Sequence, residues 1–378
     1  MKILYDLIYL EKEKQGGIST MWIEYFRKIN KSKSDVVFLG NFDSGNTAIS
    51  FLKSINFCNG DLINRTFKFG TFFSKILNLN IVNSFLLIWQ IPKNIDIFHS
   101  TGYSNPLFKR KGLRIITTIH DMVFWDQKEK MKKGIIYWDN VWGIYHSLRV
   151  SDRIITVSNT SKQSIINYFP WAEKKIDVIH HGLPENFLNV KINLKKEKYF
   201  MFIGGRNDYK NFDFLLDTFS LFVKENPDWM LYVVGQNNQT KDLENERYKK
   251  LGISANVKDY GFIEQDIIIN LIKKAAAIVI PSLNEGFNFP LLEGMACGSP
   301  ILSSNIPVSK EIGKSYVSYF DNNLAKPTNI MGHGLGYPPT HFQRSSKCGG
   351  TYCAPSYLQN EHALTQPTNN SSHSSNYN

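Results

Sequence analysis

The segment Asn284–Pro300 holds two glutamates, Glu285 and Glu293, eight positions apart. It follows a short apolar run, Ala277–Ile280, which predicts a buried strand, and it enters a predicted helix at about Phe289. Open α/β sheets bind ligands beyond the carboxyl ends of their strands, and a helix N-terminus favours an anion. Two carboxylates at such a place suit the hydroxyl groups of a sugar or ribose beside a phosphate. Gly286 would let the backbone approach that ligand closely.

Two cations follow another predicted strand, Tyr199–Ile203. Arg206 and Lys210 lie in a glycine-rich turn there, from which both could point into a cleft. A nucleotide diphosphate gains negative charge as it leaves a sugar, and a metal or fixed cations must neutralise it. Arginine offers a rigid fork and lysine a point charge. The alternative for both residues is a solvated surface position.

The first half of the chain offers a third group. His120 and Asp121 follow the apolar run Arg114–Ile119, and Gly17 precedes a helix predicted from about Ser19. A lone histidine is more often structural, but a strand end beside a cleft favours a functional role. Asp121 would either orient His120 or accept a proton from an acceptor hydroxyl. Gly17 suits a backbone contact with a phosphate, with a plain turn as the alternative.

Short apolar runs alternate with longer amphipathic runs, which predicts parallel sheets covered by helices. A lysine-rich stretch interrupts this alternation at 189–198, and the pattern then restarts. We therefore predict two Rossmann-like, doubly wound α/β domains facing a cleft, at 1–188 and 199–324, joined by a linker at 189–198. Residues 325–378 are rich in Pro, Gly, Ser, Thr, Asn and His, and we expect a disordered tail there.

The chain has 378 residues and a net charge of +11, of which residues 1–150 contribute a surplus of +9. This surplus indicates an anionic partner for the first half or ordinary lysine usage.

The four cysteines, Cys58, Cys297, Cys348 and Cys353, fit neither a disulfide scaffold nor a zinc pattern. We expect no signal peptide and no membrane span, and therefore a cytoplasmic protein.

The segment around Glu285 and Glu293 resembles the Glu-x7-Glu signature of retaining glycosyltransferases with the GT-B fold, in particular family 4 (glycosyl transferases group 1). Further stretches resemble family landmarks in the same order: Gln15–Ile18, Thr118–Asp121, Thr156–Asn159, Ile179–Gly182, Phe202–Asn211, Val233–Gly235 and Tyr260–Ile263. The resemblance covers residues 1 to about 323. The tail then replaces the family's last elements, so the second domain is expected to be incomplete.

The resemblance implies roles for these residues. Arg206 and Lys210 would bind the diphosphate in place of a metal, so no metal cofactor is expected. The other implied donor-binding residues are Gly17, Gly205, Gly286, Phe287, Asn288 and Glu293, of which Glu293 would hold the ribose. The implied catalytic residues are His120, Asp121 and Glu285. By residue type, Glu285 is a candidate nucleophile. The resemblance implies instead that Glu285 binds hydroxyl groups of the donor sugar and that the departing phosphate deprotonates the acceptor.

The implied function is transfer of a hexose from GDP-mannose or a UDP-sugar to a glycan or polyprenyl-diphosphate-linked acceptor, with retention of configuration, in cell-surface polysaccharide or lipopolysaccharide synthesis. Another sugar-nucleotide enzyme on this fold, or an inactive nucleotide-sugar-binding protein disabled by its altered C-terminus, are the alternatives. Basic and aromatic stretches in the first domain suggest contact with the anionic inner face of the plasma membrane, or merely a basic surface. No nucleic-acid partner is expected.

Overall fold

The computed structural model describes residues 1–12, 16–30, 35–40, 62–64, 79–129, 133–188, 190–191, 195–206, 208–235 and 241–322. These residues belong to one compact unit, Met1–Phe342. The predicted tail at 325–378, part of the predicted linker, and Cys58, Cys348 and Cys353 lie outside the described residues. Among the described helices, none is long and apolar enough to cross a membrane.

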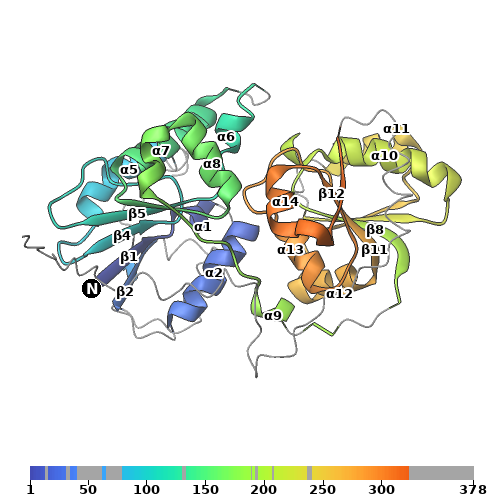
Figure 1. Ribbon diagram of the computed structural model, residues 1–378, viewed down its shortest axis with the longest axis horizontal. Helices are drawn as coiled ribbons and strands as arrows, with labels where there is room; N and C mark the ends of the chain where they lie inside the picture. Colours follow the sequence, from blue (N-terminus) through green and yellow to red (C-terminus); the bar gives the residue numbers. More distant parts are fainter. Residues whose placement is uncertain are drawn as a thin grey trace, which may run out of the picture. The chain divides into compact units, whose positions relative to one another are not determined.

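The first part of the chain forms a parallel seven-stranded sheet in the order β3-β2-β1-β4-β5-β6-β7 (Figure 1). The strands are β1 (Lys2–Asp6), β2 (Asp35–Gly40), β3 (Leu62–Asn64), β4 (Ile97–Ser100), β5 (Arg114–Ile119), β6 (Arg153–Thr156) and β7 (Ile176–Val178). The helices are α1 (Ile8–Lys12), α2 (Gly17–Asn30), α5 (Asn80–Gln90), α6 (Val123–Asp126), α7 (Ile135–Val150), α8 (Asn159–Tyr168) and the 3₁₀ helix Pro170–Lys175.

The second part repeats this architecture with a parallel six-stranded sheet in the order β10-β9-β8-β11-β12-β13. Its strands are β8 (Glu197–Ile203), β9 (Met230–Val234), β10 (Val257–Gly261), β11 (Ala275–Ile280), β12 (Ile301–Ser304) and β13 (Ser318–Phe320). Its helices are α9 (Glu185–Leu188), α10 (Phe212–Glu225), α11 (Lys241–Leu251), α12 (Gln265–Lys274), α13 (Phe289–Ala296) and α14 (Pro307–Gly313), with 3₁₀ helices at Asp208–Lys210 and Lys314–Tyr316.

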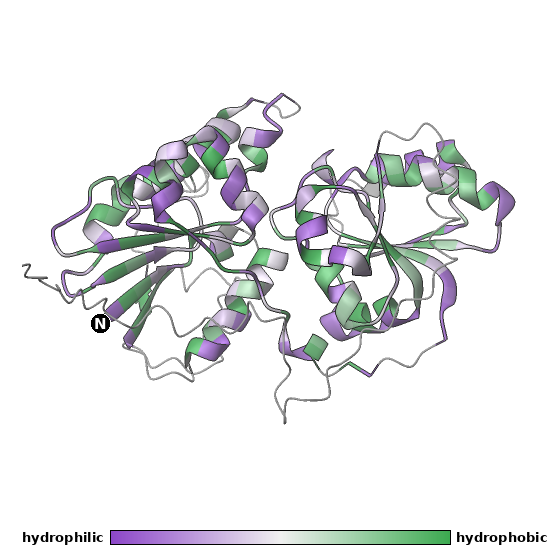
Figure 2. Cartoon of the chain, viewed as in Figure 1, coloured by the Kyte–Doolittle hydropathy of each residue, from purple (hydrophilic) through white to green (hydrophobic). Residues whose placement is uncertain are grey.

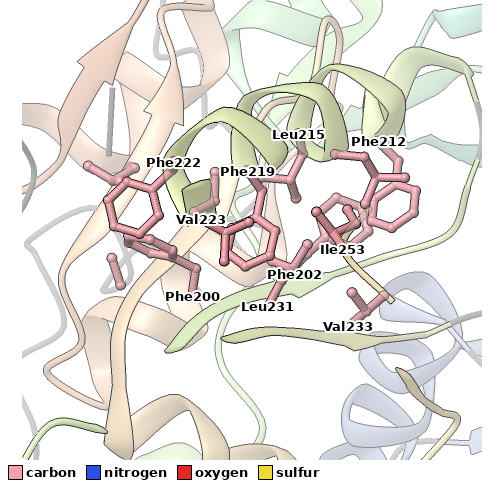
Figure 3. Close-up of a cluster of buried hydrophobic side chains, with 14 of the residues drawn as sticks. Phe200, Phe202, Phe212, Leu215, Phe219, Phe222, Val223, Leu231, Val233 and Ile253 are labelled. Atoms are coloured by element: carbon pink, nitrogen blue, oxygen red, sulfur yellow. The ribbon is translucent and has the colours of Figure 1, made fainter. Parts of the chain in front are cut away.

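Helices pack on both sheets, and most of the central strands are largely apolar, as Figure 2 shows. One face of the second sheet packs against α10 through a cluster that includes Phe200, Phe202 and Phe219 (Figure 3). The other face packs against α12 and α13. The rigid layers hold the loops at the carboxyl ends of the strands.

Two details differ from the expected boundaries. β8 begins at Glu197, inside the predicted linker, because the strand pairs with β11 from that residue onward. Phe187 and Val190 are buried in the same cluster as Tyr199 of β8, so the chain joins the second core before residue 188.

In both sheets the strand order reverses direction beside the first strand, at β1/β4 and at β8/β11. Helices lie on opposite faces on the two sides of such a switch point, which opens room for a ligand at the carboxyl ends of the strands. The prediction of two doubly wound α/β domains is confirmed.

Candidate functional site

An ion pair lies at the switch point of the second sheet. Lys210 Nζ is 2.6 Å from Glu285 Oε1, and Ser282 Oγ donates a hydrogen bond of 2.7 Å to the same oxygen. Lys210 follows β8 and Glu285 follows β11, and the Leu283 amide donates to the Tyr209 carbonyl at 2.7 Å, which ties the two loops together. The side chains of Lys210 and Glu285 keep 16% and 9% of their surface exposed. Burial disfavours the ammonium, but Glu285 outweighs that cost and raises the pKa of Lys210 above its usual value.

Asp121 belongs to the same electrostatic cluster. Burial raises the pKa of Asp121 to about 6, and the nearby Glu285 carboxylate adds to the rise while Lys210 opposes it. Asp121 Oδ1 accepts a hydrogen bond of 3.1 Å from the Val123 amide at the start of α6. The structure therefore brings Asp121, Lys210 and Glu285 together at the ends of β5, β8 and β11.

His120 is only 3% exposed, and neither ring nitrogen has a hydrogen-bond partner among the described residues. The expectation that Asp121 orients His120 is therefore wrong for this structure, because the Asp121 carboxylate turns to the Val123 amide instead. The His120 ring stacks on His181, with ring centroids 5.6 Å apart. Burial, together with His99, lowers the pKa of His120 to about 3, so the ring is neutral near pH 7 with two unused polar atoms.

Gly286 touches the backbone of His120. A Cβ atom on Gly286 would lie 2.1 Å from the His120 carbonyl oxygen, so only glycine fits there. Ser158 Oγ and Ser161 Oγ donate hydrogen bonds of 2.7 and 3.3 Å to the Gly286 carbonyl. These contacts hold the Glu285 loop against the end of β5.

We expected Arg206 to point into a cleft beside Lys210, but its side chain lies against Glu244 and Asp259 instead. Its guanidinium is ion-paired with Glu244 at 3.2 Å and with Asp259 at 3.5 Å, and it lies over the Phe212 ring, 4.3 Å from the ring centroid. Arg206 Nη1 donates to the Gly204 carbonyl at 2.7 Å. The ion pairs are made by Nε, toward Glu244, and by Nη2, toward Asp259, although neither contact has the geometry of a hydrogen bond.

The predicted donor loops lie near these groups. Gly205 is half-buried in the loop between β8 and Lys210, and Gly204 in that loop lies against the Lys210 side chain, whose Cε is 3.7 Å from the position of a Gly204 Cβ. Gly17, at the first position of α2, packs on the Phe289 ring, which would lie 2.8 Å from a Cβ at Gly17. The structure thus places Gly17 against the start of α13.

At the N-terminus of α13, Asn288 adopts the left-handed conformation with φ 70°. Its Nδ2 donates a hydrogen bond of 3.0 Å to Ser309 Oγ, while its Oδ1 is buried without a partner among the described residues. The Phe287 ring packs edge-on against His181, with centroids 4.9 Å apart. Both residues therefore shape the start of α13 from inside the protein.

Glu293, in the second turn of α13, has no side-chain hydrogen bond to the residues that the structure describes. The residue as a whole keeps some exposed surface, but burial of its carboxyl group raises the pKa of that group to about 7. A hydroxyl donor would stabilise the charged form of this carboxylate. No described contact joins Glu293 to Lys210 or Glu285.

Sequence reasoning missed Glu311 of α14. Its carboxylate accepts hydrogen bonds from the Asn159 and Thr160 amides at 2.7 and 2.9 Å, at the N-terminus of α8, and lies 2.8 Å from His180 Nε2. Burial opposes ionisation, but these donors together lower the pKa of Glu311 to about 2. The sequence gives no local sign that Asn159 and Glu311 meet, since the two residues lie 152 positions apart.

Within the described residues there is no group of three or more His, Cys, Asp or Glu side chains that could hold a metal ion.

Two sequence families match this chain. The model described as "Glycosyl transferases group 1" matches residues 185–331, and the model described as "Glycosyltransferase Family 4" matches residues 15–187. The matches adjoin and together span most of the chain, and they divide it near α9, where the packing also changes from one core to the other. The chain belongs to the group 1/family 4 glycosyltransferases of the GT-B fold.

Individual proteins are similar to parts of the chain. An uncharacterized glycosyltransferase of Methanocaldococcus jannaschii is 31% identical over 187 residues, which is 46% of this chain and 47% of that protein. The O-antigen chain mannosyltransferase RfbU of Salmonella typhimurium is 29% identical over 185 residues, covering 46% of this chain and 48% of RfbU. The chain thus spans about half the length of the curated relatives it matches.

The fold agrees with solved structures over a longer span. The crystal structure of Anabaena HepE in complex with UDP-glucose matches with a TM-score of 0.62 at 15% identity, and the match covers 89% of this chain and 90% of that chain. At this identity the similarity supports the fold alone.

Proposed function

We propose that the protein transfers a hexose from a nucleotide-diphosphate sugar to a hydroxyl of a glycan or lipid-linked acceptor, with retention of configuration, in cell-surface polysaccharide synthesis. The family supports glycosyl transfer, and the similarity to a protein named as an O-antigen mannosyltransferase supports the polysaccharide setting. GDP-mannose and a UDP-sugar both remain candidate donors, since the solved structure with the same fold holds UDP-glucose.

The observation that carries the proposal is the buried Lys210–Glu285 pair at the β8/β11 switch point. A cation and an anion side by side match a substrate whose diphosphate is negative and whose sugar becomes positive in the transition state. Arg206 adds a second cation after the same strand, although its Nε and Nη2 already face the carboxylates of Glu244 and Asp259 at 3.2 and 3.5 Å. Lys210 and Arg206 would thus neutralise the leaving diphosphate in place of a metal.

Glu285 is better suited to hold the sugar than to attack it. Its Oε1 already takes the Lys210 ammonium and the Ser282 hydroxyl, whereas Oε2 makes no hydrogen bond with the described residues. A carboxylate with two strong donors on one oxygen is a weakened nucleophile but can still accept from a sugar hydroxyl. We therefore assign Glu285 to the donor-sugar hydroxyls, and the departing phosphate to deprotonation of the acceptor on the same face.

The remaining site residues receive supporting roles. The neutral His120 ring can donate to, or accept from, a sugar hydroxyl. Asp121, with a pKa of about 6, is ionised near pH 7 and can accept a hydrogen bond from the incoming hydroxyl. Glu293 would accept from the ribose hydroxyls. The groups Gly17, Gly205, Gly286, Phe287 and Asn288 would supply backbone and shape around the donor.

The test uses the full chain with each candidate donor, with and without EDTA, and follows release of nucleoside diphosphate. Nuclear magnetic resonance of the product then gives the anomeric configuration. Acceptor-dependent release that survives EDTA and yields the same anomer as the donor supports the proposal. An inverted product would contradict retention, and donor binding without any transfer would favour the inactive nucleotide-sugar-binding protein instead.

A further inference from the structure

The helix α5 buries polar side chains and exposes apolar ones, which is the reverse of the usual arrangement in a surface helix. Its buried residues are mostly polar: Asn80, Asn83, Ser84 and Leu87. Its outer face carries Ile81, Phe85 and Trp89, spaced four residues apart, with 46%, 49% and 65% of their surface exposed. The helix has no charged residue. Large apolar side chains gathered on one exposed face indicate an interaction surface.

Polar contacts on the inner side fix the orientation of α5. The helix α7 lies beside α5 (Figure 1), and its Asp139 accepts hydrogen bonds from the Asn80 and Ile81 amides at 2.7 and 3.1 Å. Ser104 Oγ donates to Asn80 Oδ1 at 3.0 Å. Turning the helix to bury its apolar face would break these buried hydrogen bonds, so the outer face is presented rigidly.

A third exposed aromatic side chain lies in the chain segment bonded to the helix. The Leu107 amide donates to the Ser84 carbonyl at 3.1 Å, which sets Phe108, 74% exposed, beside α5. We call Ile81, Phe85, Trp89 and Phe108 the α5 surface. Phe85 and Trp89 are in edge-to-face contact, with ring centroids 4.7 Å apart.

The surroundings of the α5 surface are basic. Arg110 donates to the carbonyls of Ile91 and Pro92 just beyond the end of α5, at 3.0 and 2.6 Å, and Lys93 and Lys111 are exposed nearby. The sequence from residue 62 to residue 95 has four basic residues and no acidic residue. Exposed aromatic side chains with cations at one end of the helix complement the interface of an anionic bilayer, where tryptophan is enriched and lysine meets lipid phosphate.

We propose that the α5 surface docks the protein on an anionic lipid bilayer. The aromatic side chains enter the headgroup region while the basic residues contact lipid phosphates. The inference deepens the proposed function, since a lipid-linked acceptor resides in such a bilayer, but binding to vesicles can be measured without any transfer reaction.

The experiment is sedimentation of the full chain with vesicles of phosphatidylglycerol and phosphatidylcholine, beside vesicles of phosphatidylcholine alone. The wild type should bind the anionic vesicles more tightly. The double variant Phe85→Ser/Trp89→Ser should bind them at least about tenfold more weakly. The matched control is Phe262→Ser, which removes a phenylalanine of similar exposure, 55%, from the second domain and should leave binding unchanged.

The other results overturn the proposal. The proposal is contradicted if the wild-type protein does not bind anionic vesicles, or if the double variant binds them as tightly as the wild type. It is also contradicted by a wild-type dimer in the analytical ultracentrifuge that the double variant dissociates, because the surface would then join two copies of the chain. If the double variant melts without a cooperative transition, the single variant Trp89→Ser and the charge variant Lys93→Glu/Lys111→Glu decide by the same criterion.

Thermal shift with nucleotides separates this proposal from the proposed function. A protein that binds a nucleoside diphosphate but no vesicles overturns the membrane surface alone. One that binds vesicles but no nucleotide overturns the proposed function alone.

Discussion

Gly286 leaves no room for a side chain, and replacing it with alanine should separate the Glu285 loop from His120. The new Cβ would lie 2.1 Å from the His120 carbonyl oxygen and 3.1 Å from Asp121 Cβ. An unstrained carbon–oxygen contact is about 3.3 Å long, so the two segments must part by roughly 1 Å.

That displacement also weakens the hydrogen bond from Ser158 to the Gly286 carbonyl, now 2.7 Å long. Overpacking of this kind costs about 1–3 kcal/mol if the segments stay together. They can part instead, which limits the loss of stability but moves Glu285 relative to Asp121. A misplacement of about 1 Å can lower a rate about 100-fold.

The assay compares kcat, donor affinity and melting temperature for Gly286→Ala. We expect kcat to fall about 100-fold, because the segment that carries Glu285 is displaced from Asp121. The control is Gly182→Ala, since Gly182 has open space around its Cβ position and should tolerate alanine. Activity of Gly286→Ala within about threefold of wild type would refute the argument that this contact positions the site.

The other predictions concern separate parts of the molecule. Glu311→Gln should cost about 1–2 kcal/mol of stability near pH 7 after allowance for solvent screening. Because the folded pKa of about 2 lies below the usual value of 4.5, that difference should be complete above about pH 4.5 and shrink in urea melts at lower pH. With Asp121 ionised as the active form, kcat/KM should fall as pH drops below about 6, and Asp121→Asn should remove that limb of the pH profile. Phe219→Ala, at a fully buried position, should cost about 3–5 kcal/mol in denaturant unfolding, whereas Phe262→Ala at an exposed one should cost under about 0.5 kcal/mol.

Much of the fold could be predicted because its strands are buried on both faces and therefore read as apolar runs. The strand β5 has the bounds of the predicted apolar run Arg114–Ile119. The helix α5 was not predicted, because its uncharged sequence lacks the polar outer face that marks a surface helix. The three-residue strands β3 and β13 are too short to give a pattern.

Part of the site could also be predicted from the sequence. Lys210 and Glu285 follow strands that became neighbours in the sheet, and the rule that ligands bind at carboxyl ends of strands brings such residues together. The partners of Arg206 were not predictable, since Glu244 and Asp259 come from other elements. The same holds for Glu311 and the N-terminus of α8. Such contacts depend on tertiary packing, for which one sequence carries no local pattern.

The central claim is that the Lys210–Glu285 pair marks the binding site of a nucleotide-diphosphate sugar. The most direct measurement is calorimetric titration of the full chain, without metal, with UDP, GDP and their sugars, in wild type and in Lys210→Met/Glu285→Gln. The double substitution removes both charges and so leaves neither buried alone. Lys224→Met, on the exposed side of α10, is the control.

We predict that one nucleotide family binds the wild type and the control equally and binds the double variant at least about tenfold more weakly. Equal binding to all three proteins would place the donor elsewhere and contradict the account.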